Sequence, residues 1–245
     1  MDSGDLLDWI SRSLALLQSD VHLLKNDLSE RCITAKLGCY LHCQLNGLVS
    51  GNDKLPSDQR WHVDCEYNKW GDDTKWFPWE HPIIDETKTK TYYTPIPDII
   101  LHKRGAGGPN ELVIEAKKDN NVNPFLELID RLKLIGYLGP NMNYDFGLYL
   151  CLGENNGNLV VKTADLIEKK TVNEAMKGKG DKPRKHAMKL VNAELRKSGK
   201  VVLCHVPNSQ MKSEAKIICS EIIEAFSFVD VRERIKATQE GSKLK

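Results

Sequence analysis

Three charged residues inside an apolar hairpin pattern constrain this chain more than any other feature. Residues 97–118 read PDIILHKRGAGGPNELVIEAKK, where two apolar runs flank a glycine-rich turn, which is typical of a β-hairpin. Asp98 opens the first run, and Glu115 and Lys117 lie inside the second. Burying such groups is costly unless they are paired or hold a metal. The sequence therefore predicts that the three side chains lie together.

The spacing within the second run indicates what these side chains can do. Residues two apart on a strand share a face, so Glu115 and Lys117 point the same way and Ala116 points into the opposite layer. A strand that begins at Asp98 can set its carboxylate beside that of Glu115. Two converging carboxylates bind Mg²⁺, or Mn²⁺ as a substitute, with the Ala116 carbonyl as a natural third ligand. A lysine beside the metal can orient or deprotonate the water that attacks a phosphodiester.

Length and composition exclude several classes of protein. The chain has 245 residues, 28% of them charged and 40% hydrophobic, which suits one large globular domain or a core with an elaborated end. We find no apolar run long enough to cross a bilayer, and the acidic start MDSGDLLDWI is unlike a signal peptide. The 7 scattered cysteines favour free thiols in a reducing cytosol. We expect a cytoplasmic protein without a membrane partner.

Apolar periodicity and end signals predict an ordered series of helices and strands. Ser29 is a plausible N-cap for one helix, and Pro124 is favoured in the first turn of another. The expected helices cover residues 5–25, 30–45, 125–138, 185–198 and 213–226. Besides the hairpin, the expected strands cover residues 61–68, 144–153 and 201–206, and the nearly continuous apolar character of 144–153 suggests a central strand.

The placement of these motifs carries a family resemblance. Pro97-Asp98 followed by Glu115-Ala116-Lys117 resembles the bipartite motif of the PD-(D/E)XK nuclease superfamily, which has the restriction-endonuclease-like fold. The segment VDCEYN also resembles a VDCEYNR strand in a group of bacterial members, with Lys69 here in place of the arginine.

The order of the predicted elements implies an α/β sandwich with a mixed sheet, and the resemblance covers its middle part. A restriction-endonuclease-like core (helix, mixed β-sheet with hairpin, helix, strand) is expected over residues 29–152, where the order of elements agrees. An N-terminal helix precedes it over residues 1–28, and a basic C-terminal α/β extension over residues 153–245 packs on it.

The resemblance also implies an activity and its residues. It predicts a divalent-metal-dependent nuclease acting on DNA more than on RNA, with restriction, phage defence and repair as candidate roles and a homodimer as one possible assembly. The catalytic residues would be Asp98, Glu115, Lys117 and Glu30, a helix glutamate presented to the metal as a further ligand. The alternative is a catalytically silent member of the fold that binds nucleic acid or a partner protein.

Basic residues concentrate in the C-terminal third. Residues 162–200 hold twelve lysines and arginines against five acidic residues, although the whole chain has a net charge of only +1. This imbalance suggests a polyanionic partner gripped by residues such as Lys182, Arg184 and Lys185. A solvated lysine-rich segment explains the composition equally well.

Two smaller groups have open interpretations. Asp64, Glu66 and Asn68 alternate along one strand, where they either orient the metal ligands and Lys117 or form a solvent-facing edge. The spacing of Cys39, His42 and Cys43 is compatible with metal ligands, but no fourth ligand can be assigned and core cysteines are the better interpretation.

Overall fold

The computed structural model describes twelve stretches of the chain: residues 1–20, 29–66, 69–70, 73–74, 77–80, 92–93, 96–104, 108–119, 123–140, 142–178, 180–198 and 209–242. Their helices are α1 (Ser3–Ser19), α3 (Glu30–Cys43), α4 (Leu45–Leu48), the 3-10 helix η1 (Asn52–Lys54), α5 (Pro124–Leu138), α6 (Lys169–Lys177), α7 (Asp181–Ser198), α8 (Ser209–Ala225) and α9 (Arg232–Ser242). Their strands are β1 (Trp61–Cys65), β2 (Lys69–Trp70), β3 (Asp73–Thr74), β4 (Phe77–Glu80), β5 (Tyr92–Tyr93), β6 (Ile99–Lys103), β7 (Asn110–Lys118), β8 (Tyr144–Asn155), β9 (Asn158–Glu168) and β10 (Val229–Asp230). Asn68 and the strand expected at 201–206 lie outside the described residues.

The main sheet is mixed and mostly antiparallel, within the α/β class that was predicted. Six strands follow the order β1-β6-β7-β8-β9-β10, and β7 with β8 is the parallel pair among them. The predicted hairpin is β6 with β7, with Ile99 opposite Ile114. The predicted central strand is β8, which lies between β7 and β9. The sheet therefore carries the Asp98 and Glu115 hairpin in its interior rather than at an edge.

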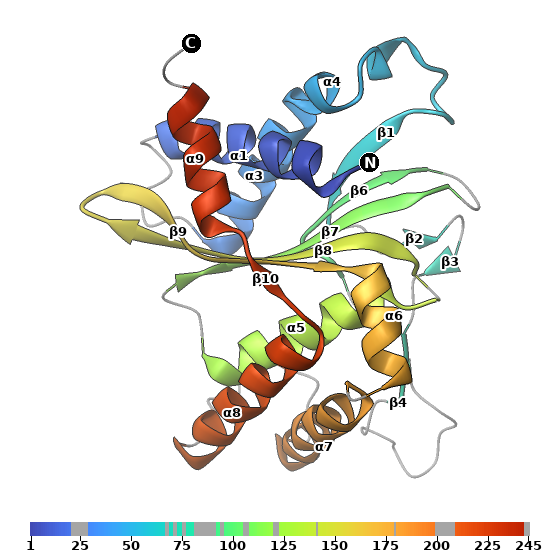
Figure 1. The fold of residues 1–245 in the computed structure, drawn as a ribbon, viewed down its shortest axis with the longest axis vertical. Coiled ribbons are helices and arrows are strands. Elements are labelled where there is room, and N and C mark those ends of the chain that lie inside the picture. Colours follow the sequence, from blue (N-terminus) through green and yellow to red (C-terminus); the bar gives the residue numbers. More distant parts are fainter. Residues whose placement is uncertain are drawn as a thin grey trace.

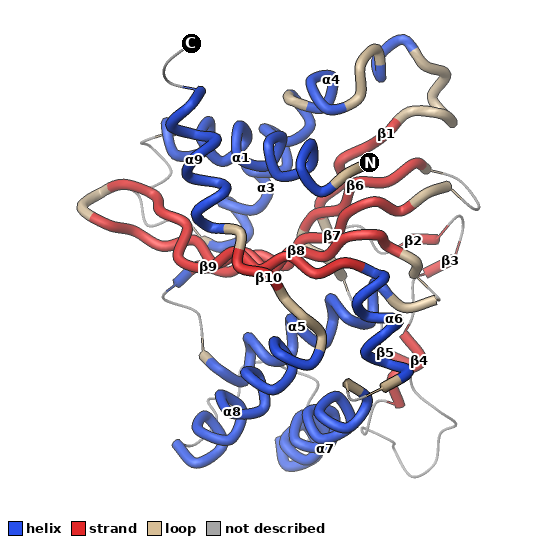
Figure 2. Tube along the Cα trace, viewed as in Figure 1, coloured by secondary structure: helices blue, strands red, loops and turns tan. Residues whose placement is uncertain are grey.

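Helices cover both faces of this sheet, as Figures 1 and 2 show. Helices α1, α3, α4 and α9 lie on one face, and α5, α6, α7 and α8 lie on the other. Alternate residues of β7 divide between the two resulting cores: Ile114 and Ala116 pack with α1 and α3, whereas Val113 packs with α5. Glu115 and Lys117 therefore share the face opposite to Ile114 and Ala116, as predicted, and both contact residues of α5 there.

The C-terminal third is built into the same sheet. β9 pairs with β8 from Asn158 to Glu168, β10 pairs with β9, and α8 packs against α5. The boundary predicted at residue 152 falls inside β8, and β9 was not among the expected strands. Lys162, Thr163 and Asp165 interrupt the apolar run of β9, so local hydrophobicity alone did not indicate this strand.

The surface departs from the prediction at two cysteines. Cys39 and Cys43 of α3 are exposed rather than buried, because the apolar face of this helix is formed by Ile33, Leu37 and Leu41.

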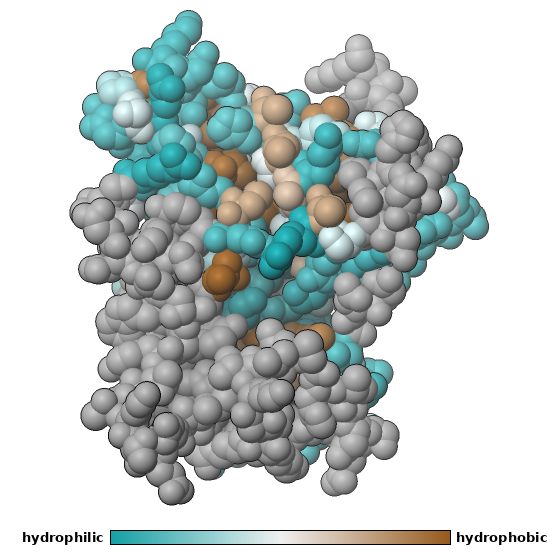
Figure 3. Space-filling view, turned by 180° about the vertical axis from the view of Figure 1, so that it is seen from behind, coloured by the Kyte–Doolittle hydropathy of each residue, from teal (hydrophilic) through white to brown (hydrophobic). Residues whose placement is uncertain are grey.

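Figure 3 shows the molecule from behind the view of Figure 1. Hydrophilic side chains cover most of the described surface on this side, with apolar ones between them in the centre. In the described stretches, no helix is both long and apolar enough to cross a membrane.

Candidate active site

The hairpin sets Asp98 beside the strand that carries Glu115. Pairing of β6 with β7 begins at Ile99 opposite Ile114, so the N–H of Ala116 lies beyond Ile99, the first residue of β6. Asp98 takes the place of a strand carbonyl there: its Oδ2 accepts the Ala116 N–H at 2.8 Å. The Glu115 side chain is fully buried, at 0% exposure.

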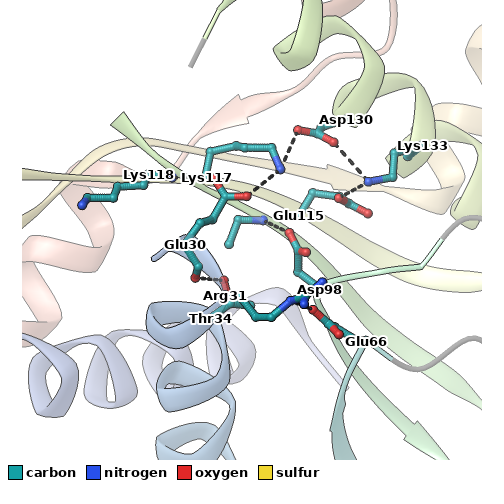
Figure 4. Close-up of polar contacts among 11 residues, drawn as sticks. Glu30, Arg31, Thr34, Glu66, Asp98, Glu115, Lys117, Lys118, Asp130 and Lys133 are labelled. Atoms are coloured by element: carbon teal, nitrogen blue, oxygen red, sulfur yellow. Dashed lines mark hydrogen bonds and ion pairs between the residues drawn. The ribbon is translucent and has the colours of Figure 1, made fainter. Parts of the chain in front are cut away.

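An alternating chain of charges leads away from Glu115, as Figure 4 shows. Lys133 Nζ donates to Glu115 Oε2 at 2.5 Å and to Asp130 Oδ1 at 3.1 Å. Lys117 Nζ lies 3.4 Å from Asp130 Oδ2 and donates to Glu30 Oε1 at 3.1 Å. Every link joins unlike charges, and the chain connects β7 to the helices on both faces of the sheet.

The local sequence aims Glu30 at the end of β7. Ser29 caps α3 by accepting the N–H of Cys32, so Glu30 is the first helical residue. Its Oε2 accepts the backbone N–H of Lys118 at 3.1 Å while its Oε1 is held by Lys117. The structure thus brings Glu30 to the predicted cluster, but to the lysine rather than to the two carboxylates. Each oxygen of Glu30 accepts one N–H bond and keeps a further lone pair, so its role as an additional metal ligand stays a prediction.

Asp130 and Lys133 were missed from the sequence. Both lie on α5, within the apolar pattern FLELIDRLKLIGYL, and both are buried, at 4% and 8% exposure. The signal was the same one that singled out the hairpin: charged residues inside a run that is typical of a buried element. An isolated helix pattern cannot say which strand such charges face, so pairing them with β7 needed the tertiary structure.

Burial and neighbouring charges shift the pKa values in this cluster. Burial raises the pKa of Glu115 well above its ordinary value, and it also raises the pKa of Asp98. Burial alone would lower the pKa of Lys117, but the carboxylates of Asp130, Asp98 and Glu30 outweigh it and raise that pKa. Lys117 is therefore a stable ammonium at neutral pH.

The cluster fits a hard divalent cation in its charge and its donor atoms. Its two lysines face four carboxyl groups, from Glu30, Asp98, Glu115 and Asp130. With all of them ionised, a surplus of two negative charges remains, which a divalent cation would neutralise. Glu115 Oε1 is buried and accepts no hydrogen bond from the residues that the structure describes. Asp98, Glu115 and the Ala116 carbonyl would supply oxygen ligands only, as Mg²⁺ prefers.

Side chains alone would not complete such a site. Within the part of the chain that the structure describes, no three His, Cys, Asp or Glu side chains converge as a metal-binding group. Mg²⁺ typically keeps several waters and takes few protein ligands, so two carboxylates and one backbone carbonyl are a sufficient set.

A pocket of about 370 Å³ opens beside Asp98. Its lining comes from the start of α3 and the end of β1: Glu30, Arg31, Thr34, Ala35, Cys65, Glu66 and Asp98. At its rim, Arg31 Nε lies 2.6 Å from Glu66 Oε1, and the Arg31 side chain is 81% exposed. The pocket therefore offers a ligand one exposed guanidinium and access to Asp98.

Asp64 and Glu66 do not act as the pair that their spacing suggested. β1 ends at Cys65, and Glu66 has a left-handed φ of 49°, so the strand alternation stops before it. Glu66 turns into the pocket, and its N–H donates to the Asp98 carbonyl at 3.1 Å. Asp64 instead accepts from His102 Nε2 at 2.8 Å and from Arg104 Nη2 at 2.6 Å. Asp64 therefore stabilises the β1–β6 pair and does not orient Lys117.

We predict that Asp64→Asn lowers the free energy of unfolding by about 2 kcal/mol at pH 7, since bonds to a partly buried charged group are lost. Burial raises the pKa of Asp64, but the hydrogen bonds from His102 and Arg104 outweigh this effect and hold that pKa below its ordinary value. Such a depressed carboxyl pKa adds stability above the unfolded pKa of roughly 4, and this stability is lost as the pH falls further. Urea melts of both proteins should converge between about pH 4 and pH 2. A constant difference across that window would contradict the assignment.

The basic residues singled out in the sequence lie apart from the hairpin. Lys182, Arg184 and Lys185 are in the first turn and a half of α7, which packs against α5, α6 and α8. Lys182 and Lys185 are exposed, and Arg184 is partly buried. α7 lies on the side of α5 away from the sheet (Figure 1).

Comparison of the chain with family models, with curated proteins and with solved structures gave no match in any of the three.

Proposed function

We propose that the protein is a divalent-metal-dependent nuclease that hydrolyses phosphodiester bonds, with DNA ahead of RNA as its substrate. The observation that carries this proposal is the partly buried carboxylate of Asp98 near the fully buried carboxylate of Glu115, beside the Lys117 ammonium and an open pocket. A buried surplus of negative charge destabilises a fold unless it serves to bind a cation. The sequence resemblance to PD-(D/E)XK nucleases supports the same assignment.

Each residue in or near the pocket has its own role in the proposed reaction. Bound Mg²⁺ or Mn²⁺ would supply a Lewis acid for the phosphoryl oxygen and the attacking water. Because its pKa is raised, Lys117 acts as a fixed positive charge that orients the water and stabilises charge on the phosphate, not as a base. Glu30 and Asp130 hold its ammonium from two sides. Arg31 can contact a neighbouring phosphate at the rim.

A second candidate is a catalytically silent module of the same fold that binds nucleic acid or a protein. The observation in its favour is the ion-pair chain itself, since Lys133 already neutralises Glu115. A silent module would keep binding its ligand in EDTA and would cleave nothing.

Incubation with plasmid, linear DNA, single-stranded DNA and RNA, in Mg²⁺, Mn²⁺ or EDTA, separates the two candidates. The nuclease proposal requires products in the presence of metal and none in EDTA, and Glu115→Gln purified in parallel controls for contaminating nucleases. Binding without cleavage under every condition would replace it with the silent module.

The C-terminal basic residues allow a separate prediction about binding. Neutralising Lys182, Arg184 and Lys185 to Gln together should weaken binding to all sequences alike, because each neutralised phosphate releases a counterion. The slope of log affinity against log salt should fall by about 0.9 for each duplex DNA phosphate that the variant no longer neutralises. Fluorescence anisotropy over a salt series measures both quantities, and kcat at saturating substrate should not change.

A control of equal charge is available on other elements. Lys54, Arg234 and Lys236 are exposed on η1 and α9. Their triple Gln variant should keep more of the salt slope than the α7 variant. Equal slopes in the two variants would mean that α7 is a solvated helix and that nucleic acid is held elsewhere.

A further inference from the structure

The buried carboxylate of Glu115 has an asymmetric environment. Lys133 Nζ lies 2.5 Å from Oε2, whereas Oε1 is buried and, among the described residues, accepts no hydrogen bond. Lys133 comes from α5, on the face of the sheet opposite α3, and its side chain is 11% exposed. One oxygen of Glu115 is thus paired with a protein cation, and the other can still act as an acceptor or a metal ligand.

Lys133 has a second partner in addition to Glu115. Its ammonium also donates to Asp130 Oδ1 at 3.1 Å, one turn earlier on the same helix. In the described stretches, the hydrogen bond that Glu115 accepts comes from Lys133. If Lys133 gave up Glu115, it would stay paired with Asp130, whereas Glu115 would need a new cation. The pair is therefore built so that Glu115 can exchange its partner without leaving the ammonium unpaired.

We infer that Lys133 is a place-holding cation: it neutralises Glu115 in the metal-free protein and yields this carboxylate to the divalent ion, while Asp130 retains the ammonium. This inference rests on the metal site of the proposed function. Lys133 is then a positioning residue that competes with the metal. It lets the protein fold without metal and, at the same time, weakens the affinity for the metal.

Lys133→Met tests this competition, because methionine fills similar volume without charge. Metal-free protein should melt at a lower temperature, since a buried carboxylate has lost its partner. Mg²⁺ affinity, measured by titration calorimetry, should rise by about tenfold or more, and Mg²⁺ should raise the melting temperature more than in the unsubstituted protein. A merely structural lysine would lower the melting temperature without raising the affinity.

Two further variants sharpen the result. Asp130→Asn should weaken Mg²⁺ binding, because Lys133 loses the partner that would retain it, and this effect should shrink in the Lys133→Met background. Lys169→Met is the matched control. Lys169 pairs with Asp145 at 2.7 Å, and Asp145 lies beside the Asn110 end of β7, whereas Lys117 lies at the other end. The Lys169→Met variant should leave Mg²⁺ affinity unchanged.

The outcomes separate this inference from the proposed function. If the unsubstituted protein binds Mg²⁺ and folded Lys133→Met binds it no more tightly, the inference is overturned and the proposed function stands. If neither protein binds Mg²⁺ or Mn²⁺, both fall. If metal-free Lys133→Met is unfolded, Mg²⁺ should restore its folded circular dichroism spectrum, and Mg²⁺ should do the same for the milder variant Lys133→Gln. If neither variant regains the folded spectrum in Mg²⁺, the inference is also overturned.

Discussion

Glu115→Gln should lower kcat for DNA cleavage by on the order of a thousandfold or more, because a Lewis acid held by this carboxylate is worth several kcal/mol of transition-state stabilisation. Calorimetry should show Mg²⁺ binding weakened in parallel. The fold should survive, since glutamine keeps the shape of the side chain and removes a buried charge whose pKa is raised by burial. Asp98→Asn should give the same two losses, whereas the bond from the Ala116 N–H to its side chain can persist through the amide oxygen.

The same strand offers a matched control for this prediction. Glu111 is also a buried glutamate of β7, at 4% exposure, but it pairs with the amino group of Met1. Glu111→Gln should leave kcat and Mg²⁺ affinity unchanged at a temperature where it is folded. Cleavage by Glu115→Gln at the rate of the unsubstituted protein, under these conditions, would remove Glu115 from the reaction.

Lys117→Met should lower kcat by on the order of a hundredfold, with little change in KM. The ammonium is fixed by Glu30 and Asp130 in the ground state, so it can act on charge that develops in the transition state without reorganising. Single-turnover cleavage at saturating DNA measures the chemical step directly. Binding of uncleaved DNA in EDTA should be nearly unchanged.

Lys118 is the neighbouring control for Lys117. Its side chain points away from the cluster in Figure 4, and its backbone N–H, which no substitution removes, makes the bond to Glu30. Lys118→Met should therefore keep its kcat. A loss of kcat in Lys118→Met that exceeds the loss in Lys117→Met would show that the role given to Lys117 is wrong.

Local patterns determined the elements that carry the site. The N-cap at Ser29 and the first-turn proline at Pro124 are where the sequence predicted them, because both depend on residues within one turn. The β6–β7 hairpin and the facing of Glu115 and Lys117 follow from turn chemistry and the period of two, which are also local. The sequence therefore predicted Asp98, Glu115 and Lys117 as neighbours from local patterns, and the family resemblance added Glu30 to them.

Tertiary structure decided which charges meet. The pairing of Lys133 with Glu115, and of Glu30 with Lys117 and Lys118, depends on how α5 and α3 pack on opposite faces of the sheet. A left-handed residue at Glu66 separated it from Asp64, although both lie in one alternating run. Periodicity states which face of an element a residue occupies, but it holds no information on what lies across from that face. Only packing brings elements distant in sequence together, and the buried pairing of Glu115 with Lys133 was therefore visible only in the folded chain.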